Sequence, residues 1–157
     1  MRVEQIMTKQ VSSCSPDNTL AEAAQLMWNH DCGCLPVCSS NGASRVVGVI
    51  TDRDICMSAL FKGQPLYELR VSDAMSRQLQ TCRPGDSLAD AERAMREARI
   101  RRLPVIDAQG ALLGMISLAD LAREAQRENT SPKQEITETE VGDTLAAICQ
   151  PSQQLAA

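Results

Sequence analysis

The stretch Gly48-Val-Ile-Thr-Asp-Arg-Asp54 recurs in altered form as Gly114-Met-Ile-Ser-Leu-Ala-Asp120. In each copy an apolar segment leads into a hydroxyl residue, and a carboxylate follows three positions later. Each copy also follows a Leu-Pro-Val tripeptide, at Leu35–Val37 and at Leu103–Val105. Because a sequence that repeats predicts a repeated structural unit, this pair of segments sets the architecture before any other feature.

The repeat extends toward the N-terminus from these segments. The matching pieces are separated by a constant offset of 71 − 3 = 68 residues. Val3 and Met7 match Val71 and Met75, Cys14–Leu20 matches Cys82–Leu88, and Ala21–Met27 matches Ala89–Met95. From Gly48 onward the offset is 114 − 48 = 66 residues. We place the two extra residues of the first copy in the turn Ser39–Arg45, because a surface turn tolerates a change of length well.

Each copy predicts the element order β-α-β-β-α. A short strand ends at a proline turn, and a helix capped by Asn18 or Thr19, or by Asp86 or Ser87, follows it. Two further strands form a hairpin, and a second helix begins at Thr51 or Ser117. The predicted strands are Val11–Cys14, Cys34–Cys38 and Val46–Thr51 in the first copy, and Leu79–Cys82, Arg102–Ile106 and Leu112–Ser117 in the second.

The predicted fold class is α+β, with the two copies related by a pseudo-twofold axis and a short C-terminal helix added. Neither copy is large enough to bury its own sheet face well. The predicted divisions are repeat 1 at 1–62, a connection at 63–70, repeat 2 at 71–127, and a polar linker with a tail helix at 128–157. The tail helix is expected over roughly 138–149, before a loose end from Pro151, and its apolar stripe is Val141, Leu145, Ala146, Ile148 and Cys149.

Composition narrows the class of protein. The chain has 157 residues, of which 43% are hydrophobic and only 2% aromatic, so the core must be aliphatic. A net charge of −4 gives no reason to expect nucleic-acid binding. The chain opens with no long apolar segment, so we expect a cytoplasmic protein without a membrane span. Trp28 and Tyr67 are single aromatic residues that we expect to serve packing.

Taken together, the two copies resemble the CBS-domain family (cystathionine β-synthase-type domains), as a tandem pair. The resemblance rests on Met7-Thr8 and Met75-Ser76, on the proline turns after Cys14 and Cys82, and on the Leu-Pro-Val and Gly-x-x-[Thr/Ser]-x-x-Asp segments described above. It covers about residues 2–126 with no catalytic domain attached. The family commonly binds adenosine nucleotides between its two repeats and often forms dimers. The resemblance thus implies a regulatory sensor of AMP, ADP, ATP or an NAD-like ligand.

The resemblance also implies two sites built crosswise, each with an aspartate for the ribose hydroxyls and a helix start near the phosphate. The first set is Val49, Thr51, Arg53 and Asp54 of repeat 1 with Ile100, Arg101 and Arg102 of repeat 2; the second is Met115, Ser117 and Asp120 with Cys32, Gly33 and Cys34. Only the first has arginines that can offset a phosphate charge, so we expect it to bind more tightly. Thr51-x-x-Asp54 and Ser117-x-x-Asp120 also fit capping boxes, which is compatible with ligand binding.

The seven cysteines are expected to be mostly small buried residues, since a reducing cytosol disfavours disulfides. His30 with Cys32, Cys34 and Cys38 has poor spacing for zinc, so no metal is predicted. No catalytic constellation is visible, and we expect neither an enzyme nor a required cofactor. Two other functions stay open: a ligand-free dimerisation and assembly module, and a thiol redox sensor. The expected partners are a second copy, a nucleotide and an unidentified regulated protein, with no nucleic acid and no membrane.

Overall fold

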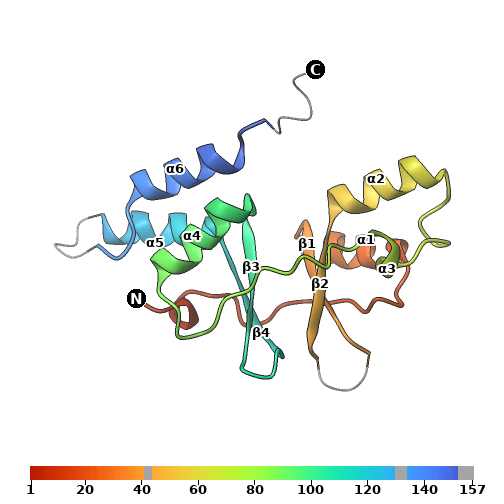
Figure 1. Cartoon of the computed structure of the whole chain (residues 1–157), viewed down its shortest axis with the longest axis horizontal. Coiled ribbons are helices and arrows are strands. Elements are labelled where there is room, and N and C mark those ends of the chain that lie inside the picture. Colours follow the sequence, from red (N-terminus) through yellow and green to blue (C-terminus); the bar gives the residue numbers. More distant parts are fainter. Residues whose placement is uncertain (41–43, 130–133, 152–157) are drawn as a thin grey trace. The chain divides into compact units, whose positions relative to one another are not determined.

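The structure, a computed structural model, describes residues 1–40, 44–129 and 134–151. The middle of the predicted turn Ser39–Arg45, most of the predicted linker and the end of the tail lie outside the described residues. The chain forms two compact units (Figure 1). Unit 1 comprises Met1–Lys9, Gln80–Val105 and Leu113–Ala157, and unit 2 comprises Gln10–Leu79 and Ile106–Leu112.

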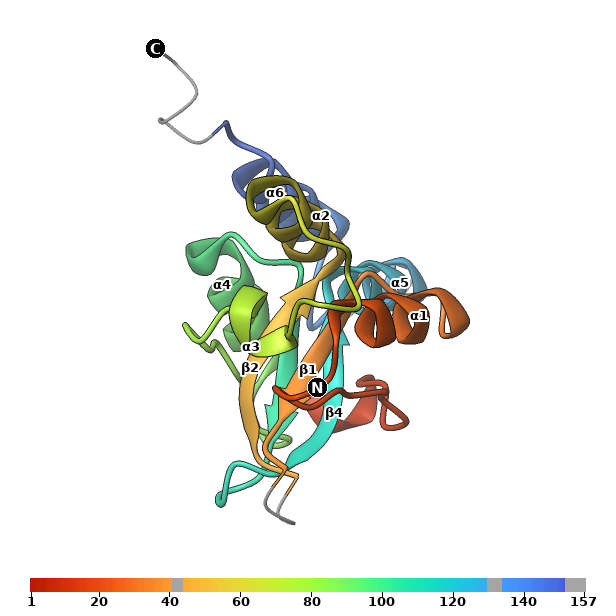
Figure 2. The same cartoon turned by 90° about the vertical axis from the view of Figure 1, so that its right-hand side faces the viewer.

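Unit 2 contains most of the first repeat. Helix α1 (Leu20–Asn29) leads to the antiparallel strands β1 (Cys34–Cys38) and β2 (Val46–Thr51), which lie side by side in Figure 2. Their register pairs Cys34 with Thr51 and Val37 with Gly48, and a bulge follows Val37. Helix α2 (Asp52–Lys62) comes next, and after the connection the short α3 (Val71–Ala74). The predicted hairpin strands and the start of the second helix are confirmed here.

Unit 1 contains the matching elements of the second repeat. These are α4 (Leu88–Ala98), the hairpin of β3 (Arg102–Ile106) and β4 (Leu112–Ser117), whose turn belongs to unit 2, and α5 (Leu118–Glu128). The tail helix α6 (Glu138–Ile148) packs on α4 and α5, and Figure 1 shows it in blue along them. The mixed α and β architecture with two repeats agrees with the predicted fold class.

The predicted first strands of the repeats were wrong in length. Cys14 makes a single parallel bridge to Val37, and Cys82 makes one to Val105. The bridge to Val37 is held by bonds from the Cys14 amide to the Pro36 carbonyl (3.1 Å) and from the Cys38 amide to the Cys14 carbonyl (2.8 Å). The partner strand carries Pro36 or Pro104 beside the paired valine, and because proline has no amide hydrogen to donate, the pairing does not extend toward the earlier residues of the segment.

The two repeats exchange their opening segments. The short 3-10 helix η1 (Val3–Gln5) stands at the start of repeat 1 but belongs to unit 1, where the Val3 amide donates to the Asp86 carbonyl at 3.0 Å. In unit 2 the Val71 amide donates in the same way to the Asn18 carbonyl at 2.9 Å. Val3 and Val71 are both fully buried. Val3, at the start of repeat 1, therefore completes the core of unit 1. Val71, at the start of repeat 2, completes the core of unit 2.

Each unit has its own aliphatic core. In unit 2 the fully buried side chains include Leu20, Leu35 and Ile50; their counterparts in unit 1 are Leu88, Leu103 and Ile116. Burying a side chain of this size stabilises the fold by about 1.5–3 kcal/mol. Exposed aromatic residues contradict the packing role predicted for them: Trp28 is 84% exposed and Tyr67 is 68% exposed. No helix in the described parts of the chain is long and apolar enough to cross a membrane.

The segment Met7-Thr8 pairs with β4, and Met75-Ser76 pairs with β2. The amides of Thr8 and Met115 each donate to the other's carbonyl at 2.9 Å. In the same way, Val49 and Ser76 exchange bonds of 3.1 and 2.9 Å. The backbones approach so closely that a β-carbon on Gly48 would lie 2.6 Å from the Ser76 carbonyl oxygen. The matching distance from Gly114 to the Thr8 carbonyl oxygen is 2.7 Å.

Tail helix α6 was predicted correctly in extent, but its predicted stripe is only partly right. Val141 and Ile148 pack against the core of unit 1, as expected. Leu145, Ala146 and Cys149 are exposed instead. The buried residue that the pattern missed is Thr144, whose hydroxyl donates to the carboxylate of Glu92 on α4. Because this polar contact fixes the rotation of α6, the apolar residues on its other side stay in contact with water.

Candidate functional site

Thr51 and Asp54 form the start of α2. The Thr51 amide and hydroxyl both donate to Asp54 Oδ2, at 2.9 and 2.7 Å, and the Asp54 amide donates to Thr51 Oγ1 at 3.2 Å. This is a complete capping box, as the spacing predicted. Within the described residues nothing bonds to Oδ1 of this half-buried aspartate. The cap therefore orients the carboxylate and leaves one oxygen able to accept a hydrogen bond.

Ser117 and Asp120 repeat this geometry at the start of α5. The Ser117 amide and hydroxyl donate to Asp120 Oδ2 at 2.8 and 2.6 Å. Here Oδ1 is also engaged, since it forms an ion pair with Arg123, and the carboxylate is buried. The two copies therefore share a cap but differ in the second carboxylate oxygen, which is open at Asp54 and paired at Asp120.

The structure brings each helix start to the residues before the Leu-Pro-Val strand of its own repeat. The Asp52 amide donates to the Gly33 carbonyl at 3.2 Å, and the Leu118 amide donates to the Arg101 carbonyl at 2.9 Å. Cys34 lies opposite Thr51 in the sheet, flanked in sequence by Cys32 and Gly33. The crosswise sets predicted above join residues of different units and stay predictions.

The amides of the first turn of α2 are already used. Asp52 bonds to Gly33, the Arg53 amide donates to Asp52 Oδ1 at 2.7 Å, and the Asp54 amide bonds to Thr51. A phosphate close to this helix start would therefore depend on side chains for its charge. Arg53, Arg101 and Arg102 are all exposed, and the Arg101 guanidinium donates to Cys149 Sγ at 3.5 Å.

Val49 and Met115 contribute backbone rather than open apolar surface. Their amides and carbonyls bond to Ser76 and Thr8, as described above, and Met115 is buried. Ile100 is half-buried against the core of unit 1. Of the predicted residues, Asp54 and the three arginines thus present the clearest polar groups to solvent.

The cysteines fall into three classes, since three are buried, Cys32 and Cys34 are half-buried, and two are exposed. Burial raises the pKa of Cys14 to about 12 and, aided by the nearby charge of Asp86, that of Cys82 to about 12. Cys38 is also buried, and its burial raises the pKa of its thiol. These three fit the predicted structural role, but Cys56 and Cys149 are exposed and do not. His30 is the exposed C-cap residue of α1.

No metal-binding group was found among the described residues: nowhere do three His, Cys, Asp or Glu side chains lie together in a way that could hold an ion. The cluster of His30, Cys32, Cys34 and Cys38 noted in the sequence is therefore not assembled as a metal site in this part of the chain.

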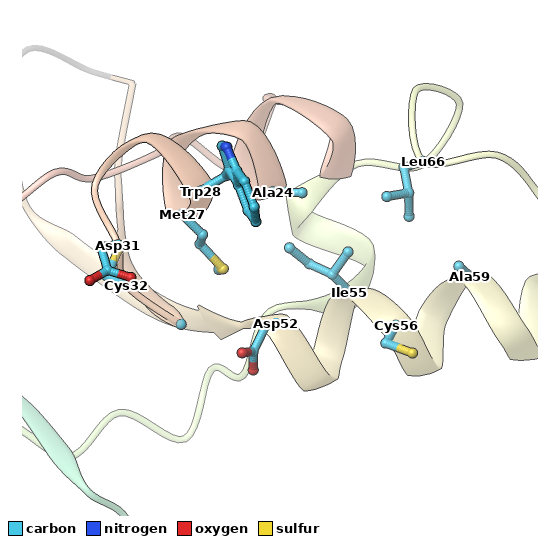
Figure 3. A pocket seen from close by; sticks show the side chains of 11 residues that line it. Ala24, Met27, Trp28, Asp31, Cys32, Asp52, Ile55, Cys56, Ala59 and Leu66 are labelled. Atoms are coloured by element: carbon cyan, nitrogen blue, oxygen red, sulfur yellow. The ribbon is translucent and has the colours of Figure 1, made fainter.

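A pocket in unit 2 was missed by the sequence analysis. It has a volume of about 630 Å³ and lies between α1, α2 and the connection that follows α2 (Figure 3). Its lining comprises Ala24, Met27, Trp28, Asp31, Cys32, Gly33, Asp52, Ile55, Cys56, Ala59 and Leu66. Thr51 and Asp54 are not among them, although the predicted Cys32 and Gly33 are. The sequence does contain a signal for this pocket, because one face of α2 is formed at helical spacing by Asp52, Ile55, Cys56 and Ala59. Three of these four positions are uncharged, which could have indicated an apolar surface.

A model of the CBS domain matches residues 3–60 and 71–127, which covers both repeats. The chain belongs to the CBS domain family. Among curated relatives, CBS domain-containing protein YhcV of Bacillus subtilis is 40% identical over 120 residues, 76% of this chain and 82% of that protein. Hypoxic response protein 1 of Mycobacterium tuberculosis is 30% identical over 146 residues, 93% of this chain and 92% of that protein.

Solved structures of CBS proteins share the fold. CBSX2 in complex with AMP aligns with a TM-score of 0.70 and 29% identity, covering 82% of this chain and 98% of that one. Hypoxic Response Protein I with two coordinated zinc ions aligns with a TM-score of 0.70 and 31% identity, covering 78% of this chain and 98% of that one. The CBS pair of this chain is thus similar both to a protein that binds AMP and to one that binds zinc.

Proposed function

We propose that this CBS pair is a regulatory, non-catalytic module that binds an adenosine nucleotide. The observation that carries the proposal is the carboxylate of Asp54, held by Thr51 at the start of α2 with one oxygen left open. A fixed carboxylate that accepts from ribose hydroxyls is a device of many nucleotide sites. The likeness to CBSX2, whose structure contains AMP, supports the same ligand class.

The proposed first site combines residues of both repeats. Thr51 and Asp54 meet the ribose, with the backbone of Val49 beside them. The phosphate is met by arginine side chains of the set Arg53, Arg101 and Arg102, with Ile100 beside the adenine. Arginine suits this role because its guanidinium can bind a phosphate in a bidentate manner. The amides of α2 are already bonded, so arginines rather than the helix start supply the positive charge.

The second proposed site, with Met115, Ser117 and Asp120, is the weaker one. Its aspartate is paired with Arg123, so a ribose hydroxyl would have to compete with an ion pair. Its partners Cys32, Gly33 and Cys34 carry no positive charge for a phosphate. We therefore expect one occupied site at low nucleotide concentration.

Isothermal titration calorimetry with AMP tests this proposal. Asp54→Asn keeps the size of the side chain but removes its charge, and we expect it to weaken AMP binding at least tenfold, or by about 1.4 kcal/mol. Asp120→Asn should weaken it less. Asp90→Asn is the matched control, because Asp90 occupies the same position after the cap Ser87 of α4, outside both proposed sites. Its affinity for AMP should equal that of the unaltered protein.

Two further titrations separate the parts of the site. Adenosine, which lacks the phosphate, should bind more weakly than AMP, and Arg101→Ala should remove much of that difference. A larger loss from Asp120→Asn than from Asp54→Asn would contradict the ranking of the sites. Absence of binding to AMP, ADP, ATP and NAD at millimolar concentration would reject the proposed function.

A further inference from the structure

The C-terminal end of helix α6 meets one of the arginines proposed above for the phosphate. Nη2 of Arg101 donates to Sγ of Cys149 at 3.5 Å, and Cys149 is the C-cap residue of α6. Both residues belong to unit 1, and both are exposed. The contact therefore lies at the surface, where a ligand can compete for the guanidinium.

The backbone around Arg101 is held firmly, whereas its side chain is not. The amide of Ile100 donates to the Met95 carbonyl at 3.0 Å, and the Arg101 carbonyl accepts from the Leu118 amide at 2.9 Å. Ile100 also packs against the core of unit 1. The guanidinium stands at the end of a long, exposed side chain. Arg101 can therefore change its partner without any change in the path of the chain.

Charge explains why the end of α6 attracts this arginine. The last carbonyls of a helix carry a partial negative charge, which a nearby cation stabilises. The last turn of α6 has no basic residue, and no Lys or Arg follows Gln134 in the sequence. Arg101 thus supplies the missing charge from outside the helix. Arg53 and Arg102, by comparison, make no side-chain hydrogen bond or ion pair with the described parts of the chain.

We propose that α6 regulates the nucleotide site by competing with the phosphate for Arg101. The inference rests on the proposed function, in which Arg101 is one of the phosphate-binding arginines. Because the guanidinium is a rigid plane, a bidentate contact with a phosphate fixes its orientation and draws it away from Cys149. A bound nucleotide then loosens the end of α6. By reciprocity, whatever strengthens the hold of α6 on Arg101 weakens nucleotide binding by the same factor.

The rest of α6 should stay in place when its end loosens. Val141 and Ile148 pack against the core of unit 1, and the Thr144 hydroxyl donates to Glu92. These contacts do not involve Arg101. The expected change is therefore confined to the last turn, where the Cys149 amide donates to the Leu145 carbonyl at 3.0 Å.

Isothermal titration calorimetry of two variants at position 149 tests the competition. Cys149→Ala removes the acceptor of Arg101 and should tighten AMP binding about twofold. Cys149→Asp offers the guanidinium an ion pair instead and should weaken AMP binding by about two- to fivefold. Adenosine has no phosphate to compete for Arg101, so its affinity should be the same in both variants and in the unaltered protein.

Two controls separate this contact from a general effect of charge. Gly142→Asp adds the same charge to α6 two turns earlier, at a position with open space around it, and should leave the affinity for AMP unchanged. In an Arg101→Ala background, Cys149→Asp should no longer weaken AMP binding, because the residue through which it acts is gone.

Hydrogen exchange at the end of α6 measures the same competition from the other side. AMP should speed amide exchange in Leu145–Cys149, whereas adenosine should not. Arg101→Ala should speed it without any ligand, and AMP should then add nothing further.

An AMP affinity that is equal in Cys149→Asp and the unaltered protein would overturn the inference and leave the proposed function standing. So would an equal loss for adenosine, a loss that persists in the Arg101→Ala background, or exchange at the end of α6 that AMP leaves unchanged. Failure of the unaltered protein to bind AMP would reject both the inference and the proposed function.

Discussion

At the scale of single residues, the repeated motif of this chain combines three separate requirements. The glycine permits the Met-Thr or Met-Ser segment to lie against the strand, since the carbonyl of that segment occupies the space of a β-carbon. The hydroxyl residue and the aspartate close a capping box around the helix start. Among the described residues the second carboxylate oxygen is unbonded at Asp54, whereas at Asp120 it is paired with Arg123. Most of the motif therefore serves the fold.

Substitution of the motif glycine tests the first of these requirements. Gly48→Ala should destabilise the protein by about 1–3 kcal/mol, because a methyl group 2.6 Å from a backbone oxygen forces the two segments apart. Gly142→Ala is the control, since Gly142 lies within α6 with open space around it and alanine favours a helix by roughly 0.5–1 kcal/mol. Urea unfolding measures both. Equal stability of Gly48→Ala and the unaltered protein would contradict the role given to the glycine.

At the scale of helices and strands, what the sequence predicted well was set by local chemistry. Thr19, Ser87, Thr51 and Ser117 cap the helices at the predicted places, and the hairpin strands have the predicted bounds. The helical face of α6 depended instead on tertiary contact. Its pattern predicted that Leu145 faces inward, but Thr144 does so instead because its hydroxyl bonds to the carboxylate of Glu92. The pocket of unit 2 was missed because its residues on α1, on α2 and in the connection after α2 meet only in the folded chain.

The burial of Glu92, to which Thr144 of α6 donates, makes the packing of α6 on α4 sensitive to pH. Burial raises the pKa of Glu92, although Arg96, at 3.3 Å, and Arg93 oppose this and Glu140 and Asp143 add to it. The folded protein thus binds this proton more readily than the unfolded chain. The resulting stability is fully present below the ordinary pKa of a glutamate and is lost as the pH rises through the raised pKa.

Glu92→Gln resembles the protonated form at every pH and keeps an oxygen for Thr144. At neutral pH we expect its Tm to exceed that of the unaltered protein by about 2–4 °C, which corresponds to about 1 kcal/mol. The difference should vanish in acid. Glu97→Gln on the exposed side of α4 is the control and should show no such trend. Thermal melts across pH measure it, and a Tm difference that grows in acid would contradict the sign.

At the scale of the whole molecule, repeats of sequence and units of packing do not coincide. Val3 stands at the head of repeat 1 and completes the core of unit 1, while Val71 completes the core of unit 2. The sequence showed that Val3 and Val71 are equivalent. It could not show the exchange, because either valine would satisfy either core and the choice depends on the path of the chain between them.

Hydrogen exchange measured by mass spectrometry tests the exchange of segments. Val3→Ala should speed amide exchange in α4 and β3, far along the sequence, and leave α1 and β1 protected. Val71→Ala should do the reverse, so each variant is the control for the other. Each removes two buried methyl groups, which is worth about 1.5 kcal/mol at roughly 0.8 kcal/mol per group. Faster exchange confined to the substituted repeat would show that the segments are not exchanged.

The exchanged opening segments also bear on how such a duplicated chain can arise. A half-length chain of residues 71–157 would lack Val3, which fills the core of unit 1, and would carry the equivalent Val71 at its own start. Two identical half-chains can each lend that segment to the other. A gene that encodes one repeat could thus produce a stable dimer of half-chains before any duplication. Joining two such genes would then replace this concentration-dependent association of half-chains with a covalent link.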